Sequence, residues 1–227
     1  MIIIPAIDIL GGKAVRLYKG DYKQPTIYGE PVEIAMKFKS MGAKYIHVVD
    51  LDGAKAGATK NFGTIEQVAK ILPIEIGGGI RDMATIDRYL QIADRVILGT
   101  IATENLSIVD DAIAKYGEDR IMVGVDVRDG KVAVNGWLEA THLDYLEFID
   151  SLSAKYIICT DITRDGTLTE PNWGMYKDIK GKNVVVSGGV ACDDDIFKAR
   201  DMGVYGVIVG KAYYEGKVDL ERCLKSV

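Results

Sequence analysis

The sequence predicts a (β/α)₈ barrel, an α/β fold of the TIM type, from three observations. Eight short Val/Ile-rich runs are typical of strands buried on both faces, and eight stretches with a 3.6-residue apolar period follow them. The second half of the chain also repeats the first. Eight alternations within 227 residues fit this fold. A doubly wound open sheet is the alternative, but it more often has fewer repeats and one dominant glycine loop.

The strands and helices alternate along the whole chain. We expect strands at residues 2–7, 45–49, 74–76, 95–98, 121–125, 156–160, 184–186 and 206–209. We expect helices at residues 32–41, 64–71, 83–92, 106–116, 143–151, 172–179, 194–202 and 218–225. No linker or low-complexity segment interrupts them, so residues 1–227 are predicted to form a single domain.

An internal duplication supports the barrel over the open sheet. Four segments recur in register, each with an Asp or a Gly just after a strand: 7–13 recurs as 125–131, 45–50 as 156–161, 76–80 as 186–190 and 96–99 as 207–210. One such match could arise by chance between β-branched strands, but four in register favour a repeat. We therefore predict two half-barrels, at about 1–117 and 118–227.

Composition excludes several classes of protein. With 48% hydrophobic residues the chain can bury a sizeable core, and with 28 Lys+Arg against 33 Asp+Glu a broad nucleic-acid or anionic-membrane surface is disfavoured. No apolar run approaches membrane-helix length, and the start lacks a basic signal-peptide region, so a cytoplasmic protein is expected. Three widely spaced cysteines and two histidines support neither a disulfide framework nor a zinc site.

Glycine is enriched, and pairs of glycines follow several strands. Backbone N–H groups at such positions can approach an anion closely, and a helix that starts just behind adds the positive end of its dipole. The loops after strands seven and eight are the usual phosphate site of this fold, so the duplication predicts a second site after strands three and four. The candidate phosphate-binding residues are Gly78, Gly79, Gly99 and Thr100 in the first half and Gly166, Gly188, Gly189, Gly210 and Lys211 in the second. A ligand with two phosphates is expected, although a tight turn would explain any single pair.

Aspartates mark the ends of strands one and five. Asp8 and Asp126 occupy duplicate positions and should face each other across the barrel axis. Two opposed carboxylates suit acid/base chemistry on a substrate between them, whereas solvated or turn-capping aspartates are the alternative. Asp165 and Gly166 follow strand six in a loop that can reach the second phosphate site.

Other polar and aromatic residues have less certain roles. Asp50 and Asp161 follow strands two and six, where we favour a structural role or the support of a neighbouring site residue. His47 lies inside strand two and is expected to be a core or interface histidine. Trp137 lies in the loop after strand five, where an exposed aromatic ring could stack on a flat ligand group. No Ser-His-Asp or Cys-His arrangement is visible.

Two long connections on the catalytic face are candidate lids. Residues 10–31 and 127–141 are the longest glycine-bearing connections expected there. Closure of both would bring Trp137 onto the bound ligand.

Several motifs together resemble the phosphoribosylformimino-aminoimidazole carboxamide ribotide isomerases of histidine biosynthesis. The resemblance covers essentially the full chain. It rests on PAID at 5–8, GKAVRL at 12–17, HVVDLDGA at 47–54, GGGIR at 77–81, GW at 136–137, TDITRDGT at 160–167 and SGGV at 187–190.

The resemblance implies an aminoaldose-ketose isomerase. Its members carry out an Amadori rearrangement of a phosphoribosyl aminal to its phosphoribulosyl isomer, on a substrate with a phosphate at each end and without a cofactor or metal. The matching positions imply Asp8 as base, Asp126 as acid, Thr160 and Asp165 as supporting groups, Arg16 and Arg81 as substrate-binding residues, and Trp137 as a stacking residue. We expect a monomer whose partner is this bisphosphorylated small molecule, with no nucleic-acid or membrane partner.

Three alternatives stay open at this point. The cyclase subunit of imidazole glycerol phosphate synthase shares the duplication and both aspartates, but it has Lys where this chain has Arg16. A bifunctional relative that also isomerises phosphoribosyl anthranilate carries Arg-Gly-Trp where this chain has Asn135-Gly136-Trp137. A non-catalytic phosphosugar sensor would keep the glycines but has no use for two opposed carboxylates. Oligomeric state, tolerance for anthranilate substrates and growth temperature are not determined by the sequence.

Overall fold

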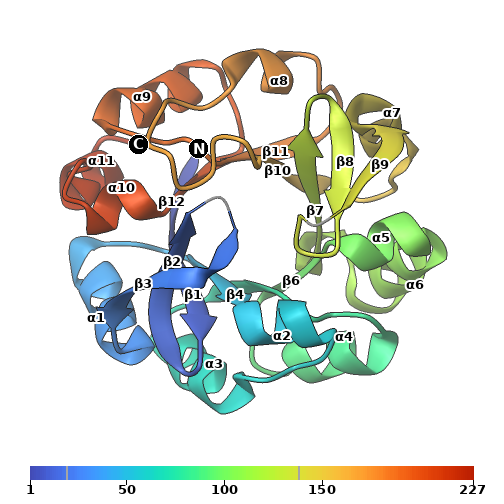
Figure 1. Cartoon of the computed structure of the whole chain (residues 1–227), viewed down its shortest axis with the longest axis horizontal. Helices are drawn as coiled ribbons and strands as arrows, with labels where there is room; N and C mark the ends of the chain where they lie inside the picture. The colour runs from blue at the N-terminus through green and yellow to red at the C-terminus, as the bar shows by residue number, and fades with distance from the viewer. Residues whose placement is uncertain (19, 138) are drawn as a thin grey trace.

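Eight parallel strands close into a barrel in the computed structural model, which describes residues 1–18, 20–137 and 139–227. The last strand pairs with the first, which closes the ring (Figure 1). In order around the ring the strands are β1 (Ile2–Leu10), β4 (Ile46–Asp50), β5 (Ile74–Gly77), β6 (Arg95–Leu98), β7 (Ile121–Arg128), β10 (Tyr156–Asp161), β11 (Asn183–Ser187) and β12 (Gly206–Val209). All eight expected strands and the barrel are confirmed.

Helices form an outer ring around the strands (Figure 1). They are α1 (Pro31–Met41), α2 (Leu51–Ala56), α3 (Phe62–Ala69), α4 (Met83–Tyr89), α5 (Thr100–Glu104), α6 (Ser107–Tyr116), the 3₁₀ turn η1 (Glu118–Arg120), α7 (Tyr145–Ser151), α8 (Trp173–Lys177), α9 (Asp193–Asp201), α10 (Lys211–Tyr214) and α11 (Leu220–Lys225). The short helices α2, α5 and α10 were not predicted, because four to six residues are too few to show a helical period. Each begins within two residues of the end of a barrel strand, so it lies at the carboxyl ends of the strands.

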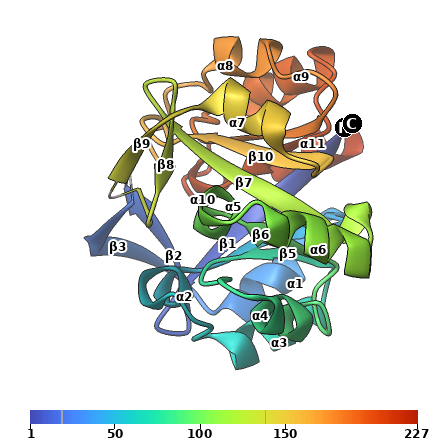
Figure 2. The same ribbon diagram turned by 90° about the vertical axis from the view of Figure 1, so that its right-hand side faces the viewer.

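Two antiparallel hairpins extend the barrel wall where the sequence predicts long loops. β2 (Lys13–Tyr18) and β3 (Asp21–Gly29) continue from β1, and β8 (Lys131–Val134) and β9 (Glu139–Asp144) continue from β7. Figure 2 shows both hairpins at the same end of the barrel. The two candidate lids are therefore built from paired strands rather than from irregular loops, and whether they move stays a prediction.

The helix expected at residues 143–151 begins two residues later than predicted. The segment 143–151 was expected to be helical throughout, but residues 143 and 144 belong to β9. Asp144 ends that strand and accepts hydrogen bonds from the backbone N–H groups of Leu146 and Glu147, which caps α7. Backbone hydrogen bonding to β8 thus outweighs the helical preference of residues 143 and 144.

Side chains alternate between two cores along each strand. In β4, Ile46 and Val48 pack outward against the helices, whereas His47 and Val49 point into the barrel. A separate apolar cluster fills the barrel interior, and it comprises Ile4, Ala6, Ile97, Met122, Tyr156, Ile158, Val185 and Ile208. This packed interior supports the floor of a cavity at the carboxyl ends of the strands.

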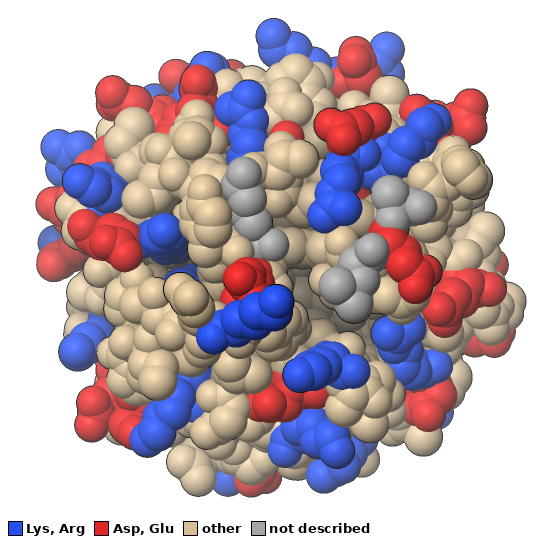
Figure 3. All heavy atoms as spheres, in the orientation of Figure 1, with Lys and Arg blue, Asp and Glu red and all other residues tan. Residues whose placement is uncertain are grey.

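The face that carries the hairpins has both signs of charge. Basic and acidic side chains are interspersed there around a central hollow (Figure 3). Among the helices of the described residues, none is long and apolar enough to cross a membrane.

Candidate active site

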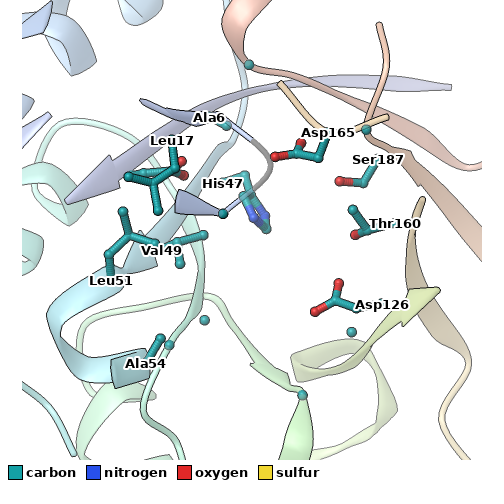
Figure 4. A pocket seen from close by; sticks show the side chains of 18 of the residues that line it. Ala6, Leu17, His47, Val49, Leu51, Ala54, Asp126, Thr160, Asp165 and Ser187 are labelled. Carbon is teal, nitrogen blue, oxygen red and sulfur yellow. The ribbon is translucent and has the colours of Figure 1, made fainter. Parts of the chain in front are cut away.

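A cavity of about 260 Å³ opens at the carboxyl ends of the barrel strands. Its walls contain every residue that the sequence predicts for catalysis, support, substrate binding or phosphate binding. Figure 4 shows Asp126, Thr160 and Asp165 on one side of this cavity and His47 facing them. The fold therefore brings these residues together around one cavity.

Asp8 and Asp126 come from strands on opposite sides of the ring. Asp8 lies in β1 and Asp126 lies in β7, which is four strands away in either direction around the barrel. Both line the cavity, so a ligand that spans it contacts both sides of the mouth. The predicted opposition of the two carboxylates follows from the strand order.

Asp8 forms an ion pair with Arg16. The Arg16 Nη1 group donates to Asp8 Oδ2 at 2.8 Å, and its Nη2 group donates to the carbonyl of Ala6 at 2.7 Å. The antiparallel pairing of β1 with β2 places the two side chains together. Arg16 was predicted to bind substrate, and here its charge is engaged by Asp8. If a substrate binds to Arg16, it would therefore also affect Asp8, the ion-pair partner of Arg16.

Asp126 accepts hydrogen bonds from uncharged side chains. Burial raises the pKa of Asp126 above its ordinary value, and hydrogen bonds from Trp137 and Thr160 oppose part of the rise. Trp137 Nε1 donates to Asp126 Oδ2 at 2.8 Å. A raised pKa favours the protonated form, which is the form that a general acid needs.

Asp165 reaches the cavity from the loop after β10. Burial raises its pKa to about 6; Arg16 opposes this rise, whereas the charges of Asp8 and Asp126 add to it. Three carboxylates therefore share one partly shielded site, and their mutual repulsion makes at least one of them easy to protonate.

The first glycine-rich end of the cavity lies after β5 and β6. Gly78 and Gly79 have positive φ values of 100° and 75°, and a Cβ atom on either would lie within 2.6 Å of a backbone carbonyl oxygen. Gly99 precedes α5, whose first residue Thr100 accepts a hydrogen bond through Oγ1 from the N–H of Asn135 at 3.1 Å. Arg81 also lines this end, with Nη1 3.7 Å from Glu104 Oε1.

The second end has the same local geometry after β11 and β12. Gly188 and Gly189 have φ values of 86° and 87°, and Gly210 precedes α10 as Gly99 precedes α5. Lys211 Nζ donates to the carbonyl of Gly166 at 2.9 Å. Both ends thus combine a glycine turn with a helix start, as the duplication predicts.

The glycine pairs also have a structural role that sequence reasoning gave only as an alternative. A Cβ atom at Gly79 would lie 2.6 Å from the oxygen of Gly53, and one at Gly189 would lie 2.7 Å from the oxygen of Glu170. Bulky substitutions at these positions would displace the neighbouring loop as well as any anion. Gly99 differs, because nothing lies within 4 Å of its added Cβ.

Asp50 and Asp161 anchor the loops after β4 and β10. Asp50 accepts hydrogen bonds from the N–H groups of Gly53, Lys60 and Asn61 and from Asn61 Nδ2. Asp161 accepts from Thr163 N and Asn172 Nδ2. The structural role predicted for both is confirmed by these contacts.

His47 is a site residue that sequence reasoning missed. Its ring lines the cavity instead of packing in a core or an interface, and its Nδ1 atom lies 2.8 Å from Glu75 Oε1 (Figure 4). Ser187 also lines the cavity from the end of β11. The alternation of side chains along β4 was the available signal, because His47 and Val49 share the face opposite to Ile46 and Val48.

The tips of the two hairpins meet over the cavity. A Cβ atom on Gly20 would lie 2.5 Å from Cε3 of Trp137, so the backbone of the β2–β3 turn packs against the indole ring. Lys211 Nζ also lies 5.4 Å from the ring centroid of Tyr18, in the same hairpin. The two hairpins thus cover the cavity, and the β2–β3 hairpin also contacts Lys211, a candidate residue of the second phosphate site.

Comparisons with known proteins agree on one family. A family model described as histidine biosynthesis protein matches residues 2–219. A relative from Lactococcus lactis subsp. cremoris is 52% identical over 233 residues, which cover 98% of this chain and 95% of the relative. A relative from Lactococcus lactis subsp. lactis is also 52% identical, with 98% of each chain covered, and one from Clostridium botulinum is 44% identical over 237 residues, covering 100% of this chain and 98% of the relative.

All three relatives carry the same name. It is 1-(5-phosphoribosyl)-5-((5-phosphoribosylamino)methylideneamino) imidazole-4-carboxamide isomerase. With similarity of this extent on a barrel whose cavity holds the predicted motifs, the chain belongs to the histidine biosynthesis protein family.

Proposed function

We propose that this protein is the aldose-ketose isomerase for which its relatives are named, and that it acts on a ribotide with a phosphate at each end. One observation carries the proposal: a single cavity combines two opposed aspartates with a glycine turn and helix start at each of two opposite ends. The cyclase and the sensor are not favoured, because the relatives are named as isomerases.

The proposed reaction needs one proton donor and one proton acceptor. Asp126 protonates the ring oxygen of the aminoribosyl group while the nitrogen electron pair forms a C1–N double bond and the C1–O bond breaks. Asp8 then removes the proton from C2, and the electron pair of that bond forms the C1–C2 double bond of an enolamine. In that step the electron pair of the C1–N double bond returns to nitrogen. Asp8 then gives its proton to C1 while the C2 hydroxyl loses its proton to Asp126, so the aminoketose forms as an isomer and both aspartates regain their starting protonation states.

The local environments support this assignment. The Asp126 carboxyl has a raised pKa, as a proton donor near neutral pH requires, whereas Asp8 is paired with the Arg16 cation. Thr160 and Asp165 support the acid, and Arg81 and Trp137 contact the substrate. No cofactor or metal takes part in the proposed steps. The protein is expected to act as a monomer in the cytoplasm, without a nucleic-acid or membrane partner.

Turnover of the purified protein on the formimino ribotide, without added ammonia, tests the proposal. Asp8→Asn and Asp126→Asn should each lower kcat by about 10²-fold or more while substrate still binds. Because an acid must be protonated, Asp126→Asn should remove the fall of kcat at high pH, and Asp8→Asn should remove the fall at low pH.

Two outcomes would contradict parts of this proposal. Near-normal kcat in either variant would make that aspartate structural, and the mechanism would have to be rebuilt around Asp165. Turnover of phosphoribosyl anthranilate at a comparable rate would show a bifunctional isomerase instead.

A further inference from the structure

Three charged or ionisable side chains form a column from the cavity floor into the barrel. His47, Glu75 and Arg95 lie on the neighbouring strands β4, β5 and β6, and they are register partners in sequence: His47 pairs with Glu75 and Glu75 pairs with Arg95. The residues next to them in each strand belong to the outer core, so these three point into the barrel.

Glu75 is fully shielded from solvent. Its Oε1 atom lies 2.8 Å from Nδ1 of His47, and its Oε2 atom has no hydrogen-bond partner among the described residues. A buried carboxylate without a neighbouring positive charge would lower the free energy of unfolding by several kcal/mol. A nearby positive charge is therefore required.

Arg95 supplies that charge from the next strand. Its Nε donates to the carbonyl of Asp119 at 3.0 Å and its Nη2 donates to Tyr205 Oη at 2.9 Å, while Nη1 has no partner among the described residues. The guanidinium carbon lies 4.6 Å from the ring centroid of Tyr156 and 5.5 Å from that of Tyr205. Aromatic rings stabilise the buried cation, and the charge of Glu75 acts on it.

We propose that Glu75 is a positioning residue that fixes the tautomer of His47, so that Nε2 faces the substrate as a hydrogen-bond acceptor for a sugar hydroxyl. An ionised carboxylate only accepts hydrogen bonds, so the proton of the neutral ring resides on Nδ1. The remaining lone pair is then on Nε2, the ring nitrogen that Glu75 does not hold, on a ring that lines the cavity. Arg95, the register partner of Glu75 on β6, brings a positive charge into the barrel interior beside it.

This inference rests on the proposed function for its substrate, and it adds a hydroxyl-recognition role that the acid and base do not supply. During the rearrangement the hydroxyl groups of the opened sugar must be held while C1 and C2 react. His47, Asp126 and Asp165 line the same cavity, and His47 faces the two aspartates in it, so the ring can contact the same ligand (Figure 4).

Nitrogen NMR of ¹⁵N-histidine-labelled protein tests the tautomer directly. The chain has two histidines, and the exposed His142 serves as the internal reference, with His142→Asn to assign its signals. At alkaline pH, where both rings are neutral, His47 should show a protonated Nδ1 and an unprotonated Nε2 in the wild-type protein. In Glu75→Gln the neutral amide can donate as well as accept, so the opposite tautomer should become populated.

Kinetics on the ribotide separate positioning from a purely structural role. His47→Asn keeps a donor near Glu75 but removes the Nε2 acceptor, and we expect kcat/KM to fall by about 10- to 100-fold, as for the loss of an orienting partner elsewhere. The kcat/KM of Glu75→Gln should fall by a similar factor. The double variant should be no worse than His47→Asn alone, because Glu75 acts through His47. His142→Asn should keep wild-type kcat/KM.

Several results would overturn the proposal. A wild-type His47 protonated on Nε2, an unchanged tautomer in Glu75→Gln, or losses that add in a folded double variant would each show that Glu75 does not act through His47. A wild-type protein without turnover would contradict the proposed function alone, and the ring-nitrogen spectra would still support or overturn the role of Glu75.

Discussion

At the scale of single residues, Asp165 shows how a buried carboxyl in the proposed active site lowers the stability of the fold at neutral pH. Burial raises its pKa from 3.8 to about 6, against the opposing charge of Arg16. The folded protein therefore holds this proton more tightly than the unfolded chain does. It follows that stability is highest at low pH with respect to this group, falls as the pH rises from about 4 to about 6, and stays reduced above that range.

We predict that Asp165→Asn stabilises the protein at pH 7.5. The neutral amide removes a shielded charge, and a shift of about two pKa units corresponds to at most about 3 kcal/mol in the free energy of unfolding. Urea unfolding at pH 7.5 and at pH 4 measures this, and the gain should shrink at the lower pH. Reduced stability at pH 7.5 would show that the attraction to Arg16 outweighs the cost of burial.

At the scale of elements, the β8–β9 hairpin positions the ring of Trp137 beside Asp126, the proposed acid. Trp137 donates to Asp126 and packs against the backbone of Gly20 in the other hairpin. Trp137 therefore has two functions in the proposal: its ring stacks on the carboxamide-imidazole, and its Nε1 group donates a hydrogen bond to Asp126. The two functions can be separated by substitution.

We predict that Trp137→Phe retains most of the substrate affinity and changes the pH dependence of kcat, whereas Trp137→Ala loses both. Loss of stacking should cost about 1–3 kcal/mol in binding, as for bases on aromatic side chains. Loss of the Nε1 hydrogen bond should raise the pKa of Asp126 further, which moves the high-pH limb of kcat upward. Equal affinity of the wild-type protein and Trp137→Ala for the ribotide would contradict stacking.

The paired glycine turns and helix starts belong to the same scale. Lys211→Met removes a cation at the second end, and Thr100→Val removes a hydroxyl at the first. We predict that Lys211→Met raises KM about 10- to 100-fold, since a charge-assisted hydrogen bond is worth about 1.5–3 kcal/mol, and that Thr100→Val has a smaller effect. Inorganic phosphate should inhibit both variants less than it inhibits the wild type.

A ligand with one phosphate checks whether both ends matter. If a singly phosphorylated half-substrate bound as tightly as the full ribotide, the two ends would not select the ligand by its length. Gly99→Ala is the matched steric test of the first end, because its added Cβ meets no protein atom within 4 Å and so enters open space.

At the scale of the whole molecule, the buried column ties the stability of the barrel to its active site. Arg95→Met removes the cation on the register partner of Glu75, together with its hydrogen bonds to the carbonyl of Asp119 and to Tyr205, and we predict a loss of about 3–5 kcal/mol in the free energy of unfolding. The exposed Arg88, which lies 4.1 Å from the ring centroid of Phe62, is the matched control, and Arg88→Met should cost about 1 kcal/mol or less.

Thermal unfolding of both variants measures this difference. The double variant Arg95→Met with Glu75→Gln should recover part of the loss, because no buried charge is then left unpaired. If Arg95→Met were as stable as Arg88→Met, the cation would not support Glu75.

A feature of this protein can be predicted from its sequence when it depends on residues that are neighbours in the chain, and not when it depends on contacts between distant segments. The Val/Ile-rich runs determine the eight strands, since a strand buried on both faces needs apolar residues at successive positions. The Asp and Gly residues that follow these runs determine the composition of the catalytic face, because parallel strands end at one edge. The division into half-barrels is a prediction from the same pattern, and the matching glycine geometry supports it.

Only the tertiary structure decided which side chains meet. The Asp8–Arg16 pair depends on the hairpin register, the Trp137–Asp126 bond depends on the path of the second hairpin, and the column from His47 depends on the register of three strands. Turn and strand signals in 10–31 and 127–141 were too irregular to predict pairing. The physical reason is that these contacts join residues on different elements, and the free energy that selects them comes from packing and charge compensation in the closed barrel rather than from local preference.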